Sequence, residues 1–176
     1  AGHTPQTLRW LRSWQEGLSH RVRVADEESE EVEWGRGSAQ GSLITPLIWS
    51  VVFSEVARIV REQCQCKLFV DDAGFFVECD GTADSFDKGV KMMQKAVDML
   101  VDFCVRWGLV LNVKKTQVMV FSRRRQWLAR GFAIHADGRR LEQTTEYKYL
   151  GMLLDSRLAL RGHCAMLYAK MQRRVH

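Results

Sequence analysis

The chain has 176 residues, of which 46% are hydrophobic and 27% charged, so it is long enough for one compact domain with a core and short for two. Lys and Arg number 26 against 21 Asp and Glu, and this modest excess permits a polyanionic partner without demanding one. No apolar run approaches the roughly 20 residues of a membrane span, and no signal-peptide pattern opens the sequence, so we expect neither a membrane-spanning nor a secreted protein.

The first part of the sequence predicts a helix and a hairpin. Apolar residues recur at helical spacing over 4–17, which predicts a helix. Residues 20–25 alternate charged and apolar side chains as a strand does, and 31–34 is expected to pair back as the second strand of a hairpin. The acidic run "DEESEEVE" (26–33) is expected to form a solvated loop.

A glycine-rich loop and a helix follow. The glycines of "GRGSAQGS" (35–42) predict a flexible loop. From Pro46 to Gln63 the apolar residues are spaced as in a helix that is buried on most faces. The stretch "KLFVDDAGFFVE" (67–78) is then typical of a strand, a carboxylate pair and a second strand.

The clearest helix of the sequence lies in its second half. Apolar residues step by three and four from Phe86 to Trp107, which predicts a helix. Asp84 is expected to cap its start, and Gly108 is expected to end it. Residues 109–122 are then expected to form a strand, a polar turn and a strand.

The last part of the sequence predicts further short strands and a helix. Asp137-Gly138 stands between two short alternating runs, which is a strong signal for a hairpin. Residues 147–155 predict another strand, and 163–176 predict the start of a basic amphipathic helix. Helices mixed with antiparallel strand pairs predict an α+β fold.

Five cysteines, an odd number, predict a reducing and intracellular compartment, without distinguishing nucleus, cytoplasm and organelle matrix. Cys64 and Cys66 form a C-x-C pair, but no second pair follows at the spacing of a zinc finger. His163 and Cys164 are too isolated to complete a zinc site. The cysteines therefore do not favour a metal centre.

The adjacent carboxylates Asp71 and Asp72 lie between two apolar runs. At the tip of a hairpin, two like charges held close repel each other unless a cation neutralises them. A hard divalent cation with oxygen ligands, Mg²⁺ or Mn²⁺, removes this repulsion. The alternative is a β-turn in which both carboxylates face water and hydrogen-bond the backbone. From this stretch alone, the two interpretations have equal weight.

Three further stretches bear on this choice. "GSAQGS" (37–42) has small residues that let a backbone lie close to a nucleotide, and Gln40 offers an amide. "LNVKKT" (111–116) sets two lysines in a turn after the long helix. "YKYLG" (147–151) adds a strand whose Gly151 permits the close approach of another backbone.

In this order, the stretches resemble the palm of a reverse transcriptase of the non-LTR retrotransposon type. The pattern is [FY]-x-D-D, preceded by G-x-x-Q-G-S and followed by L-N-x-x-K-T and Y-x-Y-L-G. The likeness extends over nearly the entire chain. It implies an incomplete palm-like antiparallel sheet packed against helices over residues 1–155, and the start of a thumb helix at 156–176. The implied activity is that of an RNA-directed DNA polymerase, which uses Mg²⁺ for nucleotidyl transfer and binds RNA or an RNA/DNA hybrid.

The resemblance also implies roles for individual residues. Asp71 corresponds to a direct metal ligand with Asp72 in support, and Lys115, or Lys114 beside it, corresponds to the general acid near pyrophosphate. The other implied contacts are template and nucleotide binding by Gly37, Gln40, Gly41 and Ser42, the primer grip at Tyr149, Leu150 and Gly151, and phosphate contacts by Arg123, Arg124 and Arg125.

One expected part of the polymerase site is missing from the sequence. Two-metal polymerases of this kind need a carboxylate from an earlier strand, and the family motif that carries it belongs before "TLRWLRSW" (7–14), where only "AGHTPQ" stands. We therefore expect the isolated chain not to polymerise, and to use Mg²⁺ only where the site is completed elsewhere. A smaller departure is Ser38-Ala39, where the family usually has Val-Pro.

Two main classes of function follow. The first is a part of an RNA-directed DNA polymerase, active when more chain or a partner supplies the rest of the palm. The second is a domesticated, non-catalytic remnant that acts as a structural or RNA-contacting subunit of a larger assembly. A soluble fold without a link to nucleic acid is the third alternative. Trp10 and Trp14 have no evident partner on the first helix, which predicts that another protein or RNA holds the domain or that it self-associates.

Overall fold

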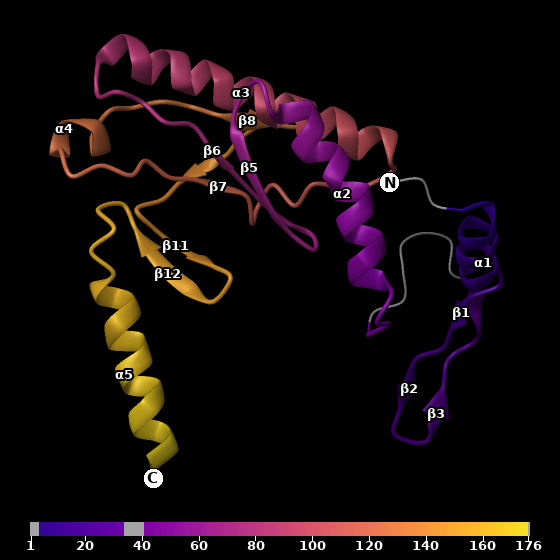
Figure 1. The fold of residues 1–176 in the computed structure, drawn as a ribbon. Coiled ribbons are helices and arrows are strands. Elements are labelled where there is room, and N and C mark those ends of the chain that lie inside the picture. The colour runs from indigo at the N-terminus through magenta and orange to yellow at the C-terminus, as the bar shows by residue number, and fades with distance from the viewer. Residues whose placement is uncertain (1–3, 34–40, 176) are drawn as a thin grey trace. The chain divides into compact units, whose positions relative to one another are not determined.

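The computed structural model describes residues 4–33 and 41–175, with side chains described up to Arg173. The chain forms two compact units, Ala1–Ser50 and Val51–His176. Its helices are α1 (Pro5–Gln15), α2 (Thr45–Val60), α3 (Ala83–Arg106), α4 (Arg125–Leu128) and α5 (Arg161–Val175) (Figure 1). None of the helices in the described part is both long and apolar enough to cross a bilayer.

The described strands pair two by two. The pairs are β1 (Ser19–His20) with β4 (Val32–Glu33), β2 (Arg23–Val24) with β3 (Glu27–Glu28), β5 (Gln65–Phe69) with β6 (Asp72–Phe76), β7 (Gln117–Val118) with β10 (Glu142–Gln143), β8 (His135–Ala136) with β9 (Arg139–Arg140), and β11 (Glu146–Tyr149) with β12 (Met152–Asp155). All pairs are antiparallel except β7 with β10. Helices with small antiparallel sheets confirm the α+β class, and the packing of these ladders into a palm-like sheet stays a prediction.

In the first unit, α1 forms where the apolar spacing predicts it. The hydroxyl of Thr4 caps the helix by accepting a hydrogen bond from the backbone N–H of Thr7 at 3.3 Å. Pro5 occupies the first turn, where a helix needs no N–H donor. No residue of α1 is buried: Trp10 exposes 53% of its surface, and Trp14 is half-buried. The helix therefore carries apolar surface that its own unit covers only in part.

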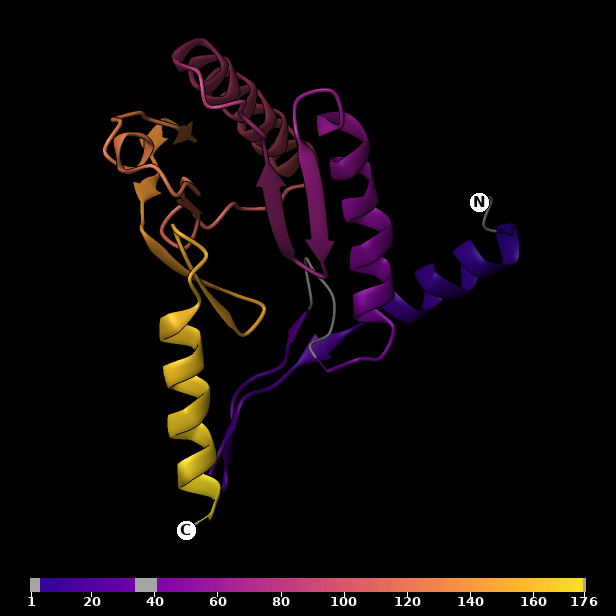
Figure 2. The ribbon, with the colours of Figure 1, turned by 60° about the vertical axis from the view of Figure 1, so that its left-hand side comes forward.

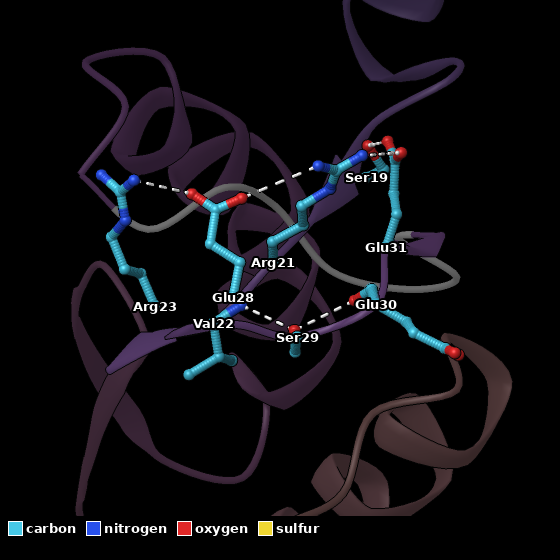
Figure 3. Close-up of polar contacts among 8 residues, drawn as sticks. All are labelled: Ser19, Arg21, Val22, Arg23, Glu28, Ser29, Glu30 and Glu31. Atoms are coloured by element: carbon cyan, nitrogen blue, oxygen red, sulfur yellow. Dashed lines mark hydrogen bonds and ion pairs between the residues drawn. The ribbon is translucent and has the colours of Figure 1, made fainter. Parts of the chain in front are cut away.

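The acidic run was predicted to form a solvated loop. In the structure, part of it is paired in the hairpin. Strands β2 and β3 pair around a turn at 25–26, so part of the run is a strand. Figure 3 shows why: the guanidinium of Arg21 lies 2.8 Å from the carboxylate of Glu31 and 3.8 Å from that of Glu28. Hydrogen bonds from Ser19 and then Arg21 lower the pKa of Glu31. Arg21, which lies between β1 and β2, thus faces two acidic residues across the hairpin, and this opposite-charge pairing favours the hairpin.

Helix α2 buries one stripe of residues and not most of its surface. Phe53, Val56 and Val60 are buried, whereas Leu47 and Val51 expose 66% and 54% of their surfaces. The prediction of burial on most faces is therefore wrong. The reason is geometric, because residues three and four apart line only one side of a helix.

One face of α3 carries the core of the second unit. The helix is capped by Thr82, whose Oγ1 accepts a hydrogen bond from the N–H of Ser85 at 3.2 Å. The predicted cap, Asp84, lies instead in the first turn, because Thr82 has the extended backbone that a cap requires. Phe103 is fully buried and packs edge-on against Phe53, with ring centroids 5.8 Å apart. This aromatic pair joins α3 to α2.

A second buried group joins α3 to the β8–β9 hairpin, which lies along it in Figure 1. Its members are Val97, Ile134, Ala136 and Leu141. Gln94 adds a polar clamp, since its side-chain amide donates to the carbonyl oxygen of His135 and accepts from the N–H of His135, each at 2.8 Å. The hairpin turns at Asp137-Gly138, which confirms the prediction.

Two of the predicted strand regions are wrong. Residues 109–116 contain a turn and no strand, and the following β7 pairs in parallel with β10. Residues 147–155 form the β11–β12 hairpin in place of one strand. Its turn, Leu150-Gly151, has positive φ at both residues, 47° and 85°, as a type I′ turn requires. This turn could not be recognised from the sequence, because Leu precedes the glycine where Asn or Asp is usual.

The link between β12 and α5 is organised by one carboxylate. Asp155 accepts hydrogen bonds from the backbone N–H groups of Arg157, Ala159 and Leu160 at 3.0, 3.1 and 2.6 Å. These bonds hold Leu158 and Leu160 at positive φ, 52° and 55°. Such a conformation costs a non-glycine residue about 1–2 kcal/mol. Asp155 therefore offsets backbone strain in this link.

We expect Asp155→Asn to lower the thermal unfolding midpoint at neutral pH. Hydrogen bonds from Ala159 and then Leu160 lower the pKa of Asp155 below its ordinary value of 3.8. Because the folded pKa lies below the unfolded one, this stabilisation is complete above pH 3.8 and is lost as the pH falls through the folded pKa. The wild-type midpoint should therefore approach that of the variant in acid.

Circular dichroism melts at several pH values measure this convergence. Asp102→Asn, at an exposed aspartate of α3, is the control and should leave the midpoint nearly unchanged at every pH. A constant difference between wild type and Asp155→Asn down to the most acidic sample contradicts the expectation.

Candidate active site

The carboxylate pair lies at the tip of the β5–β6 hairpin. The register pairs Phe69 with Asp72, so a two-residue turn, Val70-Asp71, closes the hairpin. Both carboxylate residues are exposed. Val70 has a φ of 55°, which is rare for a β-branched residue and marks a strained turn. The predicted strand, carboxylate pair and strand are confirmed.

The two faces of this hairpin differ in burial. Side chains alternate along a strand, and residues paired across strands share a face. The half-buried face carries Phe75, which packs against the buried group that joins Val97 of α3 to the β8–β9 hairpin. Figure 2 shows the hairpin standing beside α2 and α3. The opposite face, called the open face below, consists of Gln65, Lys67, Phe69, Asp72, Gly74 and Phe76, of which all but Gly74 are exposed.

The donor atoms at the tip suit magnesium. Asp71 and Asp72 offer carboxylate oxygens, which Mg²⁺ prefers over nitrogen and sulfur ligands. Within the described ranges, no group of three or more His, Cys, Asp or Glu side chains could hold a metal ion. Mg²⁺ is usually bound through one or two carboxylates together with substrate phosphates and water. The pair therefore fits an ion shared with a phosphate ligand, and not a closed structural metal centre.

The tip of the β11–β12 hairpin brings Tyr149 to the open face. A Cβ atom built on Gly74 would lie 3.4 Å from the hydroxyl oxygen of Tyr149. Burial and then the charge of Asp72 raise the pKa of Tyr149, which places the phenol within the field of that carboxylate. The structure thus brings a predicted primer-grip residue beside a predicted metal ligand. Gly74, which makes this contact, was not among the predicted site residues, and its only sequence signal is a glycine inside a strand.

The other two predicted primer-grip residues form the hairpin turn. Leu150 exposes 49% of its surface. A Cβ atom on Gly151 would meet nothing within 4 Å, so the space beside it is open and the approach of another backbone stays a prediction. Glycine is favoured here because the turn requires positive φ.

The predicted lysines lie in a turn after α3. The backbone N–H of Lys115 donates to the carbonyl oxygen of Asn112 at 3.0 Å and closes this turn. The side chains of Lys114 and Lys115 are exposed. The turn therefore presents both ammonium groups to solvent.

Of the predicted template and nucleotide residues, Gly41 and Ser42 belong to the first unit. Gly37 and Gln40 lie outside the described residues. Gly41 has a φ of 86°, and the hydroxyl of Ser42 accepts a hydrogen bond from the N–H of Ile44 at 3.3 Å. These contacts organise the start of α2.

The arginine-rich stretch 122–130 is anchored to the start of α3. Trp127 stacks on Phe86 with ring centroids 5.5 Å apart. Arg130 lies over both rings, 5.3 Å from the centroid of Phe86, and its guanidinium is 2.8 Å from both carboxylate oxygens of Asp87. Arg130 is therefore an anchor of this segment. The predicted phosphate contacts Arg123, Arg124 and Arg125 are exposed.

The described cysteines are free thiols. Cys66 lies in β5, and Cys64 lies just before this strand. Burial raises the pKa of Cys64 to about 11 and also raises the pKa of Cys66. Both thiols are therefore protonated at neutral pH, whereas metal binding requires the thiolate. They act as packing side chains.

Comparison with known proteins agrees with this geometry. Residues 1–154 match the family model of the reverse transcriptase (RNA-dependent DNA polymerase). No solved structure gives a significant match.

The curated relatives come from mobile elements. The chain is 27% identical over 160 residues to the "Putative 115 kDa protein in type-1 retrotransposable element R1DM" of Drosophila melanogaster, which covers 90% of this chain and 15% of that protein. It is 22% identical over 178 residues to the "RNA-directed DNA polymerase from mobile element jockey" of Drosophila funebris, covering 98% of this chain and 19% of that protein. It is 26% identical over 159 residues to the "Probable RNA-directed DNA polymerase from transposon BS" of Drosophila melanogaster, covering 87% and 17%.

The chain thus spans 15% to 19% of the length of these relatives. The family match covers most of its residues, and the relatives agree with the non-LTR retrotransposon type that the motifs predict. The chain belongs to the reverse transcriptase (RNA-dependent DNA polymerase) family.

Proposed function

We propose that this chain forms part of the palm of an active RNA-directed DNA polymerase, in which Asp71 and Asp72 hold Mg²⁺ for nucleotidyl transfer. The observation that carries the proposal is the exposed carboxylate pair at a strained hairpin tip, on a hairpin whose other face packs into the core. A hairpin fixed in this way holds its carboxylates in one place, as a preorganised site requires. The activity is proposed for the whole protein that contains these residues.

The chain's own residues have distinct parts in this chemistry. Asp71, in the turn, is proposed as the direct ligand, and Asp72, at the start of β6, as its support. Bound Mg²⁺ supplies activation of the primer 3′ oxygen and neutralises charge on the leaving pyrophosphate. Lys115, whose ammonium is exposed, is proposed to donate a proton to that leaving group.

The ligand set needs one more carboxylate. Two-metal sites clamp both the attacking and the leaving oxygen, and the described residues offer no third acidic side chain beside the pair. We therefore propose that residues 1–176 alone do not extend a primer and that a carboxylate from elsewhere in the palm completes the site.

Nucleic-acid contacts complete the proposal. Template and incoming nucleotide are proposed to lie along Gly37, Gln40, Gly41 and Ser42, and the primer end along Tyr149, Leu150 and Gly151. Residues 156–176, which include α5, are proposed to begin the thumb. The ligand is then RNA or an RNA/DNA hybrid.

The test is extension of a DNA primer on an RNA template by the longest natural protein that contains these residues. Extension that requires the RNA template and stops when Mg²⁺ is chelated supports the proposal. The absence of extension at every Mg²⁺ concentration, from a protein that is folded by circular dichroism, contradicts it.

Replacing Arg123, Arg124 and Arg125 together by Gln is expected to weaken binding to single-stranded RNA and to make it less salt-dependent. Each phosphate contact on a single strand contributes about 0.7 to the slope of log K against log salt, so three contacts predict a slope smaller by about 2. Fluorescence anisotropy with a labelled RNA at several salt concentrations measures this slope. The control removes the same charge from exposed lysines of α3, Lys88, Lys91 and Lys95. Equal slopes in the two triple variants contradict the assignment.

A further inference from the structure

Two Asp-Gly dipeptides lie in the second unit, Asp80-Gly81 and Asp137-Gly138. In such a dipeptide the backbone nitrogen of glycine can attack the side-chain carboxyl carbon of the aspartate, because no Cβ atom shields that nitrogen. A bond forms between this nitrogen and this carbon, and the carboxyl OH leaves with the amide hydrogen as water. A water molecule then opens the resulting cyclic imide at its backbone carbonyl, so that the chain continues through the side-chain carbonyl as isoaspartate. Water is the only other reactant, and no group is oxidised or reduced.

The carboxylate of Asp80 is held away from this reaction. Its Oδ1 accepts hydrogen bonds from the backbone N–H of Thr82 at 2.8 Å and from the hydroxyl of Thr82 at 2.7 Å. This Asx turn directs the carboxylate to residue 82 and not to the nitrogen of Gly81. The hydroxyl of Thr82 and then its backbone N–H lower the pKa of Asp80, and an ionised carboxylate has no OH group to release. Because Thr82 also caps α3, the Asx turn is fastened to the start of that helix.

Asp137 lacks these restraints. It lies in the turn of the β8–β9 hairpin, and both residues of its dipeptide are exposed. Among the residues that the structure describes, none donates a hydrogen bond to the Asp137 carboxylate or forms an ion pair with it. A Cβ atom on Gly138 would meet nothing within 4 Å, so the glycine side of the turn is open. The two dipeptides therefore have the same chemistry and differ in how the fold holds the carboxylate.

We propose that Asp137 is a site of spontaneous conversion to isoaspartate in the folded protein, and that the Asx turn protects Asp80 from the same modification. Exposed turns are the parts of a fold where the backbone has most freedom to rearrange. The inference depends on the geometry of the two turns and not on the polymerase activity.

The conversion is expected to loosen the core of the second unit. It adds a carbon atom to the backbone of a two-residue turn that is flanked by the pair of Ala136 with Arg139. Turn type and loop length fix the register of a hairpin, so the longer turn no longer matches this pairing. Ala136 and Ile134 each expose only 1% of their surfaces, and both belong to the buried group against α3. The modified form should therefore have a lower thermal midpoint than the unmodified form.

The first experiment locates the modification. The chain, shown to be folded by circular dichroism, is incubated in warm, mildly acidic buffer. Isoaspartate is then labelled by an isoaspartyl methyltransferase with radioactive S-adenosylmethionine, and the labelled peptides are mapped. Label should accumulate with time in the peptide that contains Asp137 and stay several times lower in the peptide that contains Asp80. Equal labelling of the two peptides, or no label at Asp137, overturns the proposal.

Variants and denaturant make this comparison specific. Asp137→Ser should remove the label, whereas Asp102→Ser, at an exposed aspartate that no glycine follows, should leave it unchanged. In urea both Asp-Gly peptides should be labelled, because unfolding removes the Asx turn. Label that stays confined to Asp137 in urea overturns the protective role of Thr82.

The second experiment measures the consequence for stability. The modified and unmodified forms are separated by ion-exchange chromatography, and their thermal midpoints are compared by circular dichroism. A lower midpoint of the modified form supports the expected loosening of the core, and equal midpoints contradict it.

Discussion

Asp71→Asn is expected to lower RNA-templated primer extension by about 10³-fold or more, which corresponds to about 4 kcal/mol of lost transition-state stabilisation. Asparagine has nearly the same shape as aspartate, so the turn is expected to keep its geometry. The substitution removes one negative charge and one ligand oxygen from the tip of the β5–β6 hairpin. Asp72→Asn is expected to cost less, because Asp71 is proposed as the direct ligand of the ion and Asp72 as its support.

Steady-state extension with saturating primer and nucleotide measures this loss, and circular dichroism confirms that the variant is folded. Asp137→Asn makes the same chemical change in the turn of the β8–β9 hairpin, where asparagine suits the positive φ of 50°. This control should extend as fast as wild type. Equal extension by Asp71→Asn and wild type removes the metal role of Asp71.

Phe103→Ala is expected to destabilise the second unit by about 3–5 kcal/mol. Phe103 is fully buried, and its ring contacts both Phe53 and Trp107, with centroids 5.8 Å away in each case. Truncation removes this packing and leaves a cavity between α2 and α3. A domain of this size is commonly stable by only about 5–15 kcal/mol in total, so the loss is a large part of its stability.

Urea unfolding, followed by circular dichroism, measures the free energy of unfolding of this variant. Val105→Ala is the matched control on the same helix, because Val105 exposes 73% of its surface. A surface change of this kind is expected to fall within about 0.5 kcal/mol of wild type. If the two variants unfold at the same urea concentration, Phe103 does not have the core position described above.

Helices α1, α2 and α3 were predictable because their apolar residues recur at helical spacing, whereas the short α4 was not predicted. The steps from Phe86 to Trp107 place one stripe on α3, and most of that stripe is buried or half-buried in the structure, whereas Trp107 at its end exposes 55% of its surface. The turn at Asp137-Gly138 was predictable because its residue types favour positive φ locally. Such features depend on neighbours in the sequence and can be recognised without tertiary information.

The missed elements depend on contacts that are distant in sequence. Strand β7 pairs with β10, and this pairing does not follow from the alternation of 109–122 alone. The turn at Leu150-Gly151 lacks the usual residue before glycine, so the hairpin at 147–155 was taken for one strand. Tertiary context overrides local propensity in both places.

The candidate site was likewise predictable where it depends on neighbours in the sequence and not where it depends on distant contacts. Asp71 and Asp72 are adjacent in sequence and flanked by apolar runs, so their hairpin could be recognised directly. The contact between Tyr149 and Gly74 joins two ladders that lie far apart in the sequence, and it depends on how those ladders pack. The anchoring of Arg130 by Asp87 has the same origin.

The clamp made by Gln94 has a consequence for assembly. A primary amide carries one acceptor and one donor side by side, just as a peptide group does, so at His135 the side chain of a helix takes the place of a further strand. At this residue, the edge of β8 therefore has hydrogen-bond partners for both its backbone N–H and its backbone C=O. A visiting chain that sought to extend the β8–β9 ladder by backbone pairing would first have to displace Gln94, which protects this edge against unwanted strand addition.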